Sequence, residues 1–323
     1  IYNEKLDVGL SLIAPFELSK PGVSFLFDGS ESEVIYGIRP TIYYDEPRRM
    51  PYLQVCNMNL GLRDEREVQA GLLIVPHKGD WRPGLGWVYR RYRGYFDPKL
   101  EDAHEHAGLH AMGFRLTEGE LRRLSSYGRV LWEIHGYFPF YGLFVPDEPW
   151  YSLGKTEGRP YVKLSFDDIR GLIRLLHRYG AHAYIYWEIR EGLREWVERE
   201  FPDSLVKTER GEPVLALRGE LPGGCYLLNP DLRYSWGRHC LEQAMKLLET
   251  YPEVDGIFVD GYREMEMDFA HDDGVTMVHN KPCYFWNFAY HGIMREVSDA
   301  CHSRGKGLYG NKPVTVESQR YLD

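Results

Sequence analysis

The chain has 323 residues, of which 43% are hydrophobic and 27% are charged, a balance typical of a soluble globular protein with one large or two ordinary domains. Its net charge of −9 and the lack of a basic run argue against nucleic acid as a partner, while 24 Tyr and 8 Trp suit stacking on a neutral polar ligand. No apolar stretch reaches the roughly 18 residues that a membrane span needs, and no signal-peptide pattern opens the chain. We therefore expect a soluble protein, cytoplasmic or extracellular, that does not contact a membrane.

The cysteine pattern argues against a structural metal. The chain has 5 Cys, an odd number, and no Cys-x-x-Cys pair, so neither a disulfide framework nor a zinc site is indicated. We expect no metal and no other cofactor. Arg outnumbers Lys 28 to 11 while Asn and Gln together number 11, which favours a source that lives at high temperature.

The first part of the sequence has the spacing of antiparallel β structure. Short apolar or alternating runs occupy residues 8–15, 23–27, 34–38, 41–44, 53–58 and 70–75. Turn residues such as Pro21-Gly22 and Asp28-Gly29 separate the runs. This pattern predicts a β-sandwich over residues 1–96.

Residues 97–128 are expected to be a linker with one short helix. Thr117 and Glu120 have the spacing of a capping box, which marks the start of that helix. The linker also contains His104, His106 and His110, which could ligate a metal if they lay on a helix. A polar linker accounts for the three histidines equally well.

From residue 129 the pattern alternates between strands and helices. We expect strands at residues 130–135, 183–188, 225–229, 256–260 and 308–311. Ser165 and Asp168 are expected to cap a helix that ends at Gly180. Further helices are expected over residues 236–250, from about residue 285 to Gly305, and from Glu317 onward. Regular alternation of this kind predicts a parallel sheet with right-handed crossovers. No Gly-x-Gly-x-x-Gly or phosphate-binding loop follows a strand, so a (β/α)₈ barrel is favoured over an open doubly wound sheet. Residues 129–323 supply five β/α units, which do not close a barrel. We therefore expect a further segment or chain to complete it.

Asp260 is the strongest catalytic candidate in the sequence. It ends the apolar run of residues 256–259, and reacting groups in parallel α/β folds lie beyond the carboxyl ends of strands. Sugar hydrolysis uses two carboxyl groups, and aromatic rings stack on the sugar. The candidate sugar-binding residues at the strand ends and in the loop after Asp260 are Trp132, His135, Trp187, Glu188, Asp231, Arg263, Asp268, His271, Asp272 and Asn311.

Residues 129–323 resemble the retaining (β/α)₈ glycoside hydrolases of the α-galactosidase and α-glucosidase kind, families 36 and 31, and the related endo-α-N-acetylgalactosaminidases. The resemblance rests on residues 255–260, on Asn311 and on the segment Leu228-Asn229-Pro230-Asp231. It implies a β-sandwich before the barrel, Asp260 as the nucleophile of the fourth strand, and an α-linked oligo- or polysaccharide as substrate. Glu317 is the nearest candidate for the acid/base. Phe258 stands where the α-galactosidases carry Lys, so the resemblance does not identify the sugar.

Two other functions remain open from the sequence. One is a glycan-binding or structural protein on a hydrolase scaffold that has lost catalysis. The other is a metal-dependent polysaccharide deacetylase, because His271-Asp272-Asp273-Gly274 is similar to the Asp-Asp-Gly motif of those enzymes. No convincing His-x-x-x-His partner follows that motif.

Overall fold

The computed structural model describes most of the chain from residue 73 onward and short segments before it. The described residues are 2–3, 8–13, 16–17, 39–45, 50–56, 69–70, 73–80, 82–153, 161–216, 224–260, 267–274, 276–311 and 319–323, with side chains from residue 75 onward except Asn287.

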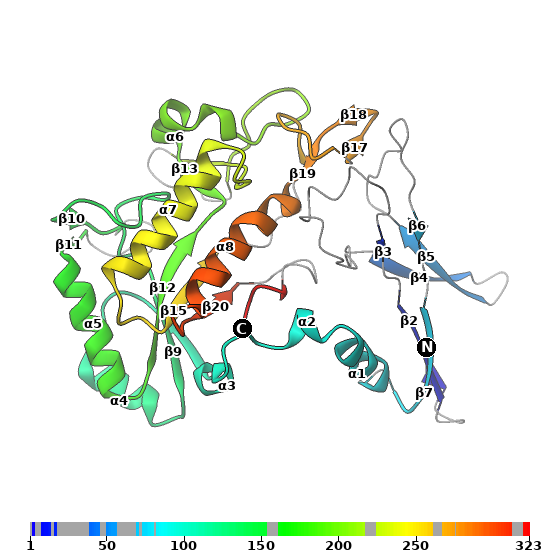
Figure 1. The fold of residues 1–323 in the computed structure, drawn as a ribbon, viewed down its shortest axis with the longest axis horizontal. Coiled ribbons are helices and arrows are strands. Elements are labelled where there is room, and N and C mark those ends of the chain that lie inside the picture. Colours follow the sequence, from blue (N-terminus) through cyan, green and yellow to red (C-terminus); the bar gives the residue numbers. More distant parts are fainter. Residues whose placement is uncertain are drawn as a thin grey trace.

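A parallel sheet of five strands forms the centre of the fold (Figure 1). Its strands are β8 (Leu109–Met112), β9 (Val130–Ile134), β12 (His182–Glu188), β15 (Gly256–Asp260) and β20 (Gly307–Gly310). Each strand pairs in parallel with the next one along the chain. The order of strands in the sheet is therefore the order in the sequence.

One helix or more follows each of the first four strands. The helices packed against the sheet are α4 (Glu118–Ser125), α5 (Phe166–Arg178), α7 (Ser235–Thr250) and α8 (Tyr290–His302). In Figure 1, α7 and α8 lie side by side across the sheet. The predicted capping boxes are confirmed, because Thr117 caps α4 with Glu120 and Ser165 caps α5 with Asp168.

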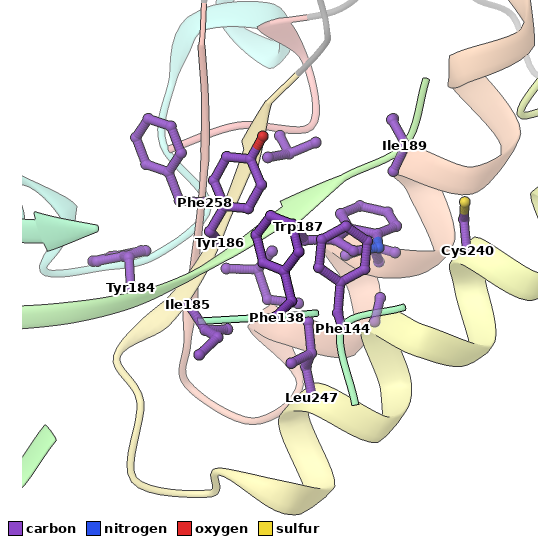
Figure 2. Close-up of a cluster of buried hydrophobic side chains, with 14 of the residues drawn as sticks. Phe138, Phe144, Tyr184, Ile185, Tyr186, Trp187, Ile189, Cys240, Leu247 and Phe258 are labelled. Carbon is purple, nitrogen blue, oxygen red and sulfur yellow. The ribbon is translucent and has the colours of Figure 1, made fainter. Parts of the chain in front are cut away.

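The two faces of the sheet differ in chemistry. Residues that face each other across a parallel ladder point to the same side, and the side alternates along each strand. Tyr184 is aligned with Glu133 and Gly256, and Glu188 with Asp260, so these positions share one face, which we call the polar face. The alternate positions form the apolar face, which packs against the helices. Figure 2 shows Tyr186 and Phe258 on one side of β12, with Ile185 and Leu247 of α7 on the other.

Two glycines, Gly256 and Gly307, leave room for the ring of Tyr184 on the polar face. A Cβ at Gly256 would collide with the carbonyl oxygen of Gly307 and with the ring of Tyr184, and a Cβ at Gly307 would collide with the Tyr184 hydroxyl. Tyr184 itself is fully buried. The absence of two side chains on β15 and β20 therefore makes the space that this tyrosine fills.

Two expectations about the strands are wrong. Residues 225–229 do not belong to the parallel sheet: β14 (Cys225–Leu227) pairs antiparallel with β13 (Glu191–Leu193) in a separate small sheet. The sheet instead begins with β8, which lies within the expected linker. Periodicity missed β8 because its four residues are mostly exposed and too few to show a buried apolar run.

The remaining elements are short. After residue 80 they are α1 (Arg82–Arg91), α2 (Arg93–Phe96), α3 (Ala103–His106), β10 (Trp150–Tyr151), β11 (Lys163–Leu164), α6 (Arg194–Glu200), η2 (Pro202–Ser204), β16 (Met267–Asp268), β17 (Met277–Val278), β18 (Lys281–Pro282), β19 (Tyr284–Phe285) and η3 (Trp286–Ala289). The region expected to start a helix near residue 285 is thus β19 and η3, with α8 following. No helix in the described part of the chain is long and apolar enough to cross a membrane.

The described N-terminal segments are strands in antiparallel pairs. They are β1 (Tyr2–Asn3), β2 (Val8–Ile13), β3 (Phe16–Glu17), β4 (Arg39–Asp45), β5 (Met50–Cys56), β6 (Gln69–Ala70) and β7 (Leu73–Lys78). β2 pairs with β1 and β7, β3 with β6, and β4 with β5. The antiparallel character agrees with the expectation, while the β-sandwich over residues 1–96 stays a prediction.

Candidate active site

Asp260 lies at the carboxyl end of β15 and is half-buried. The hydroxyl of Tyr186 donates to its Oδ2 at 3.1 Å, and Nδ2 of Asn311 donates to its Oδ1 at 3.0 Å. Tyr186 belongs to the neighbouring strand β12, and Asn311 directly follows β20 on the other side. Each carboxylate oxygen of Asp260 thus accepts a hydrogen bond from a different flanking strand, which fixes the plane of the carboxylate.

Glu188 is a second carboxyl group close to Tyr186. Its Oε2 lies 3.3 Å from the Tyr186 hydroxyl, so this hydroxyl stands between Glu188 and Asp260. Glu188 is completely buried. The predicted site residues Glu188 and Asp260 are therefore linked through Tyr186, and Asn311 joins them through Asp260. Tyr186 is not among the residues expected from the sequence.

Two further charged groups are buried next to Glu188. The backbone N–H of Arg190 donates to Glu188 Oε1 at 2.9 Å, and the Arg190 guanidinium lies 3.6 Å from the same oxygen and 3.2 Å from Oε1 of Glu191. Burial raises the pKa of Glu188 well above its ordinary value. Arg190 opposes this rise, whereas Asp260 and Glu191 add to it.

His135, another predicted residue, also reaches this group. Its Nδ1 lies 2.7 Å from Oε1 of the buried Glu133, and its ring contacts the ring of Tyr186 at 4.1 Å between centroids. His110 lies 3.0 Å from the other oxygen of Glu133. Burial by itself raises the pKa of Glu133, but the hydrogen bonds from His110 and His135 outweigh it and lower that pKa.

We call these residues the Asp260 cluster: Glu133, His135, Tyr186, Glu188, Asp260 and Asn311. It combines carboxyl, imidazole, hydroxyl and amide groups at the carboxyl ends of neighbouring parallel strands. This is the position at which parallel α/β enzymes carry their reacting groups.

A second network contains three other predicted residues. Asp268 is buried and accepts from Asn229 Nδ2 at 3.0 Å and lies 2.5 Å from His271 Nδ1. Asp231 accepts from the Tyr284 hydroxyl at 2.6 Å and pairs with Arg233 at 2.9 Å. His271 Nε2 also lies 2.8 Å from the carbonyl oxygen of Asp203. The bond between Asn229 and Asp268 holds the segment after β14 to the 267–274 loop, and His271 joins the same loop to η2.

Asp272 and its neighbour do not support the deacetylase reading. Asp272 is exposed and accepts from the backbone N–H of Gly274 at 2.7 Å. Asp273 is buried and accepts from the backbone and hydroxyl of Thr276 and from the backbone of Phe285. Both carboxylates thus stabilise the loop.

The histidines of the expected linker do not form a common site. The His106 ring stacks on His182 at 4.0 Å and its Nδ1 lies 2.5 Å from the Tyr184 hydroxyl, whereas His110 contacts Glu133. His104 pairs with Glu105. Among the residues that the structure describes, no group of three ligands is placed to hold a metal ion.

Trp132 and Trp187, which the sequence predicts to bind sugar, do not face the Asp260 cluster. Trp132 and Trp187 are on the apolar face and are 4% and 0% exposed. Trp132 donates its ring N–H to the carbonyl oxygen of Gly113. Alternation along the strand is the reason, because Trp187 precedes Glu188 and must point away from it.

Arg263 and Glu317 lie outside the described residues. The sequence contains a signal for Tyr186, because Tyr184, Tyr186 and Glu188 are spaced two residues apart in a strand and therefore share one face.

Comparisons with known proteins agree with the fold. No protein-family model matches the sequence, and no curated protein matches it. Among solved structures, the ligand-free α-N-acetylgalactosaminidase NagBb from Bifidobacterium bifidum covers 97% of this chain and 52% of its own, with 16% identity and a TM-score of 0.57. The α-galactosidase TtGalA from Thermus thermophilus, in complex with stachyose, covers 77% of this chain and 48% of its own, with 13% identity and a TM-score of 0.41.

At these identities the likeness concerns the fold alone. The chain shares its fold with the ligand-free α-N-acetylgalactosaminidase. It spans about half the length of these two solved structures.

Proposed function

We propose that the protein is a retaining glycoside hydrolase that acts on an α-linked oligo- or polysaccharide, with Asp260 as the nucleophile. The observation that carries this proposal is the placement of Asp260 at the carboxyl end of the fourth strand of the sheet, with Tyr186 and Asn311 each bonded to one carboxylate oxygen. Hydrogen bonds to the ionised form favour a carboxylate at neutral pH, and a nucleophile must be ionised.

The architecture that we propose is a (β/α)₈ barrel, preceded by the β-sandwich of residues 1–96 and a linker. Two observations support the barrel: the strands follow one another in chain order, and the described helices α4, α5, α7 and α8 pack on the apolar face. The polar face would then line the interior. A further segment or chain would supply the remaining strands beside β8 and β20.

The reaction would proceed in two steps. Asp260 attacks the anomeric carbon while an acid protonates the leaving oxygen, and the products are a glycosyl ester of Asp260 and the released alcohol. The acid of the first step is a second carboxyl group. In the second step this group deprotonates a water molecule, which then cleaves the ester. That group must lie roughly 5–5.5 Å from Asp260 in a retaining enzyme. Glu317, or a carboxyl group of the completing segment, is the candidate.

His135 and Asn311 are the side chains best placed to orient the sugar, since both belong to the Asp260 cluster and carry hydrogen-bonding groups. Asp231, Asp268, His271 and Asp272 would act through the neighbouring loop, with Arg263 from the segment after Asp260. The α linkage rests on the resemblance to α-galactosidases and on the α-N-acetylgalactosaminidase among the matching structures. The chemistry needs no cofactor.

A screen of aryl α- and β-glycosides against the wild type and Asp260→Ala tests the proposal. We expect hydrolysis of an α-glycoside by the wild type and a loss of several orders of magnitude in the variant. Asp260→Gly with added azide should recover activity and yield a β-glycosyl azide, because azide enters from the side of the missing carboxylate. Asp167→Asn, which changes an exposed carboxylate on α5, is the control. Full activity in Asp260→Ala would remove Asp260 from the mechanism.

One observation favours glycan binding without hydrolysis as the second candidate. The other two carboxyl groups of the Asp260 cluster, Glu133 and Glu188, are buried and hydrogen-bonded, so neither is placed to protonate a leaving group in solvent. Calorimetric binding of an oligosaccharide by a wild type that turns over no glycoside would favour this function.

A further inference from the structure

The hydroxyl of Tyr186 is shared by two carboxyl groups but has a single hydrogen. It lies 3.1 Å from Asp260 Oδ2 and 3.3 Å from Glu188 Oε2, and it can donate to one of them at a time. If both carboxyl groups were ionised, the tyrosine oxygen would face one of the two carboxylate oxygens with no hydrogen between them. A proton on one carboxyl group resolves this, because that group can then donate to the tyrosine oxygen.

The surroundings decide which carboxyl group carries the proton. Glu188 is completely buried, and the one guanidinium of Arg190 faces both Glu188 and Glu191. Asp260 is half-buried and also accepts from the amide of Asn311. Burial penalises a charge on Glu188 far more than one on Asp260. The proton therefore belongs on Glu188.

We propose that Glu188 is held in its protonated form and positions Asp260 through Tyr186. Oε2–H of Glu188 donates to the tyrosine oxygen, and the tyrosine hydrogen is directed to Asp260 Oδ2. Glu188 is thus a positioning residue for the nucleophile. The inference rests on the proposed role of Asp260 for its effect on catalysis, but the arrangement of hydrogens can be tested without any substrate.

The charged and titratable groups that face this arrangement come from several elements. Glu188 and Tyr186 lie on β12, Asp260 ends β15, and Arg190 and Glu191 follow β12. Glu133 and His135 approach Tyr186 from β9 and the residue after it. Burial raises the pKa of Tyr186 well above its ordinary value, so this hydroxyl keeps its hydrogen throughout the working pH range.

Infrared spectroscopy of the wild type tests the protonation directly. At about pH 8 ordinary carboxyl groups are ionised, so a carbonyl stretch of a protonated carboxyl group reports a buried one. We expect this band in the wild type, a small shift in deuterated water, and its loss in Glu188→Gln. A wild-type spectrum without the band overturns the proposal, even if Glu188→Gln does not fold.

The pH dependence of kcat/KM tests the coupling to Asp260. Tyr186→Phe removes a hydrogen bond to the ionised nucleophile, so kcat/KM should fall about ten- to hundredfold and its acid limb should move to higher pH. Glu188→Gln replaces one neutral group by another, so the acid limb should stay in place. If Glu188 were ionised, the loss of its charge would lower the pKa of Asp260 and move the limb to lower pH, which would contradict the proposal.

Tyr251→Phe is the matched control for the tyrosine variant. Tyr251 is equally buried, and its hydroxyl has no hydrogen-bond partner in the part of the chain that the structure describes. It follows α7, at the amino end of β15, and its variant should keep the wild-type pH profile. The hydrolase function and the protonated state of Glu188 can be refuted separately. An infrared band without glycoside turnover argues against the hydrolase function alone. Turnover without the band argues against the protonated Glu188 alone.

Discussion

Oδ2 of Asp255 lies 2.9 Å from Nε2 of His177, just before β15 and at the opposite end of that strand from Asp260. The same oxygen accepts the backbone N–H of Ala183 at 2.6 Å. Burial alone raises the pKa of Asp255, but hydrogen bonds from His177, His182 and Ala183 outweigh it and lower that pKa. The hydrogen bond to Asp255 likewise raises the pKa of His177. A stabilising carboxylate thus precedes β15, and the carboxylate of the proposed nucleophile ends it.

The first prediction is the pH dependence of stability at Asp255. The lowered pKa of Asp255 gives stability that is present above about pH 3.9 and is lost as pH falls through the folded pKa. The raised pKa of His177 gives stability that is present below about pH 6.5 and is lost as pH rises through the folded pKa. Asp255→Asn should therefore lower the free energy of unfolding most between about pH 4 and 6.5.

Urea denaturation of the wild type and Asp255→Asn at a series of pH values measures this difference. The exposed Asp167→Asn serves as the control, with a small difference at every pH. A difference for Asp255→Asn that does not change with pH would show that the ionic interaction contributes little.

The second prediction concerns the glycines beside Tyr184. Gly256→Ala should lower the free energy of unfolding by about 1–3 kcal/mol or more, because the new methyl group collides with the backbone of Gly307 as well as with the tyrosine ring. Gly119→Ala is the opposite case: this glycine is inside α4 with no atom within 4 Å of the added Cβ, so the variant should gain about 0.5–1 kcal/mol. Thermal and urea unfolding of the two variants should give opposite signs.

The third prediction concerns Asp323, whose side chain joins three segments. Its carboxylate accepts the backbone N–H groups of Lys99, Leu100 and Leu308 at 2.8, 2.8 and 2.9 Å, and lies 2.7 Å from His302 Nε2. Asp323→Asn turns one acceptor into a donor that faces other donors, and should cost about 2–4 kcal/mol. Chemical denaturation measures the cost, with the exposed Asp299→Asn on α8 as control. Equal stability of the two variants would contradict this role.

The fourth prediction separates the two faces of β12 and β9. Trp187→Phe should lower the free energy of unfolding by about 1–3 kcal/mol and leave KM unchanged, because Trp187 is buried on the apolar face. His135→Ala should raise KM for a glycoside, since His135 belongs to the Asp260 cluster. A change in KM for Trp187→Phe with no loss of stability would place Trp187 in the sugar site after all.

The sequence predicted the elements whose signals are local. The capping boxes at Thr117 and Ser165, the strand that ends in Asp260 and the position of Asn311 depend on neighbouring residues and are confirmed. Residues 225–229 were misassigned because their apolar run resembles a sheet strand, whereas pairing partners are decided by tertiary structure.

The candidate site could be predicted only in part for the same reason. Asp260, Glu188, His135 and Asn311 come together as strand-end residues, but the role of Tyr186 depends on its distances to two carboxyl groups. Trp187 was assigned to the site from its residue type, although its place next to Glu188 in an extended strand requires the opposite face. The buried charges next to Glu188 belong to Arg190 and Glu191. Their positions depend on the turn after β12, which the sequence does not predict.

The alternation along β12 also limits how this protein can change in length during evolution. A single-residue insertion or deletion between Tyr184 and Tyr186 would move Tyr186 to the face that packs against the helices and Trp187 to the polar face. Every side chain of the strand beyond the change would exchange faces. Insertions in the loops that follow the strands leave this alternation intact. Homologues should therefore differ in length after the strands and keep the number of residues within them.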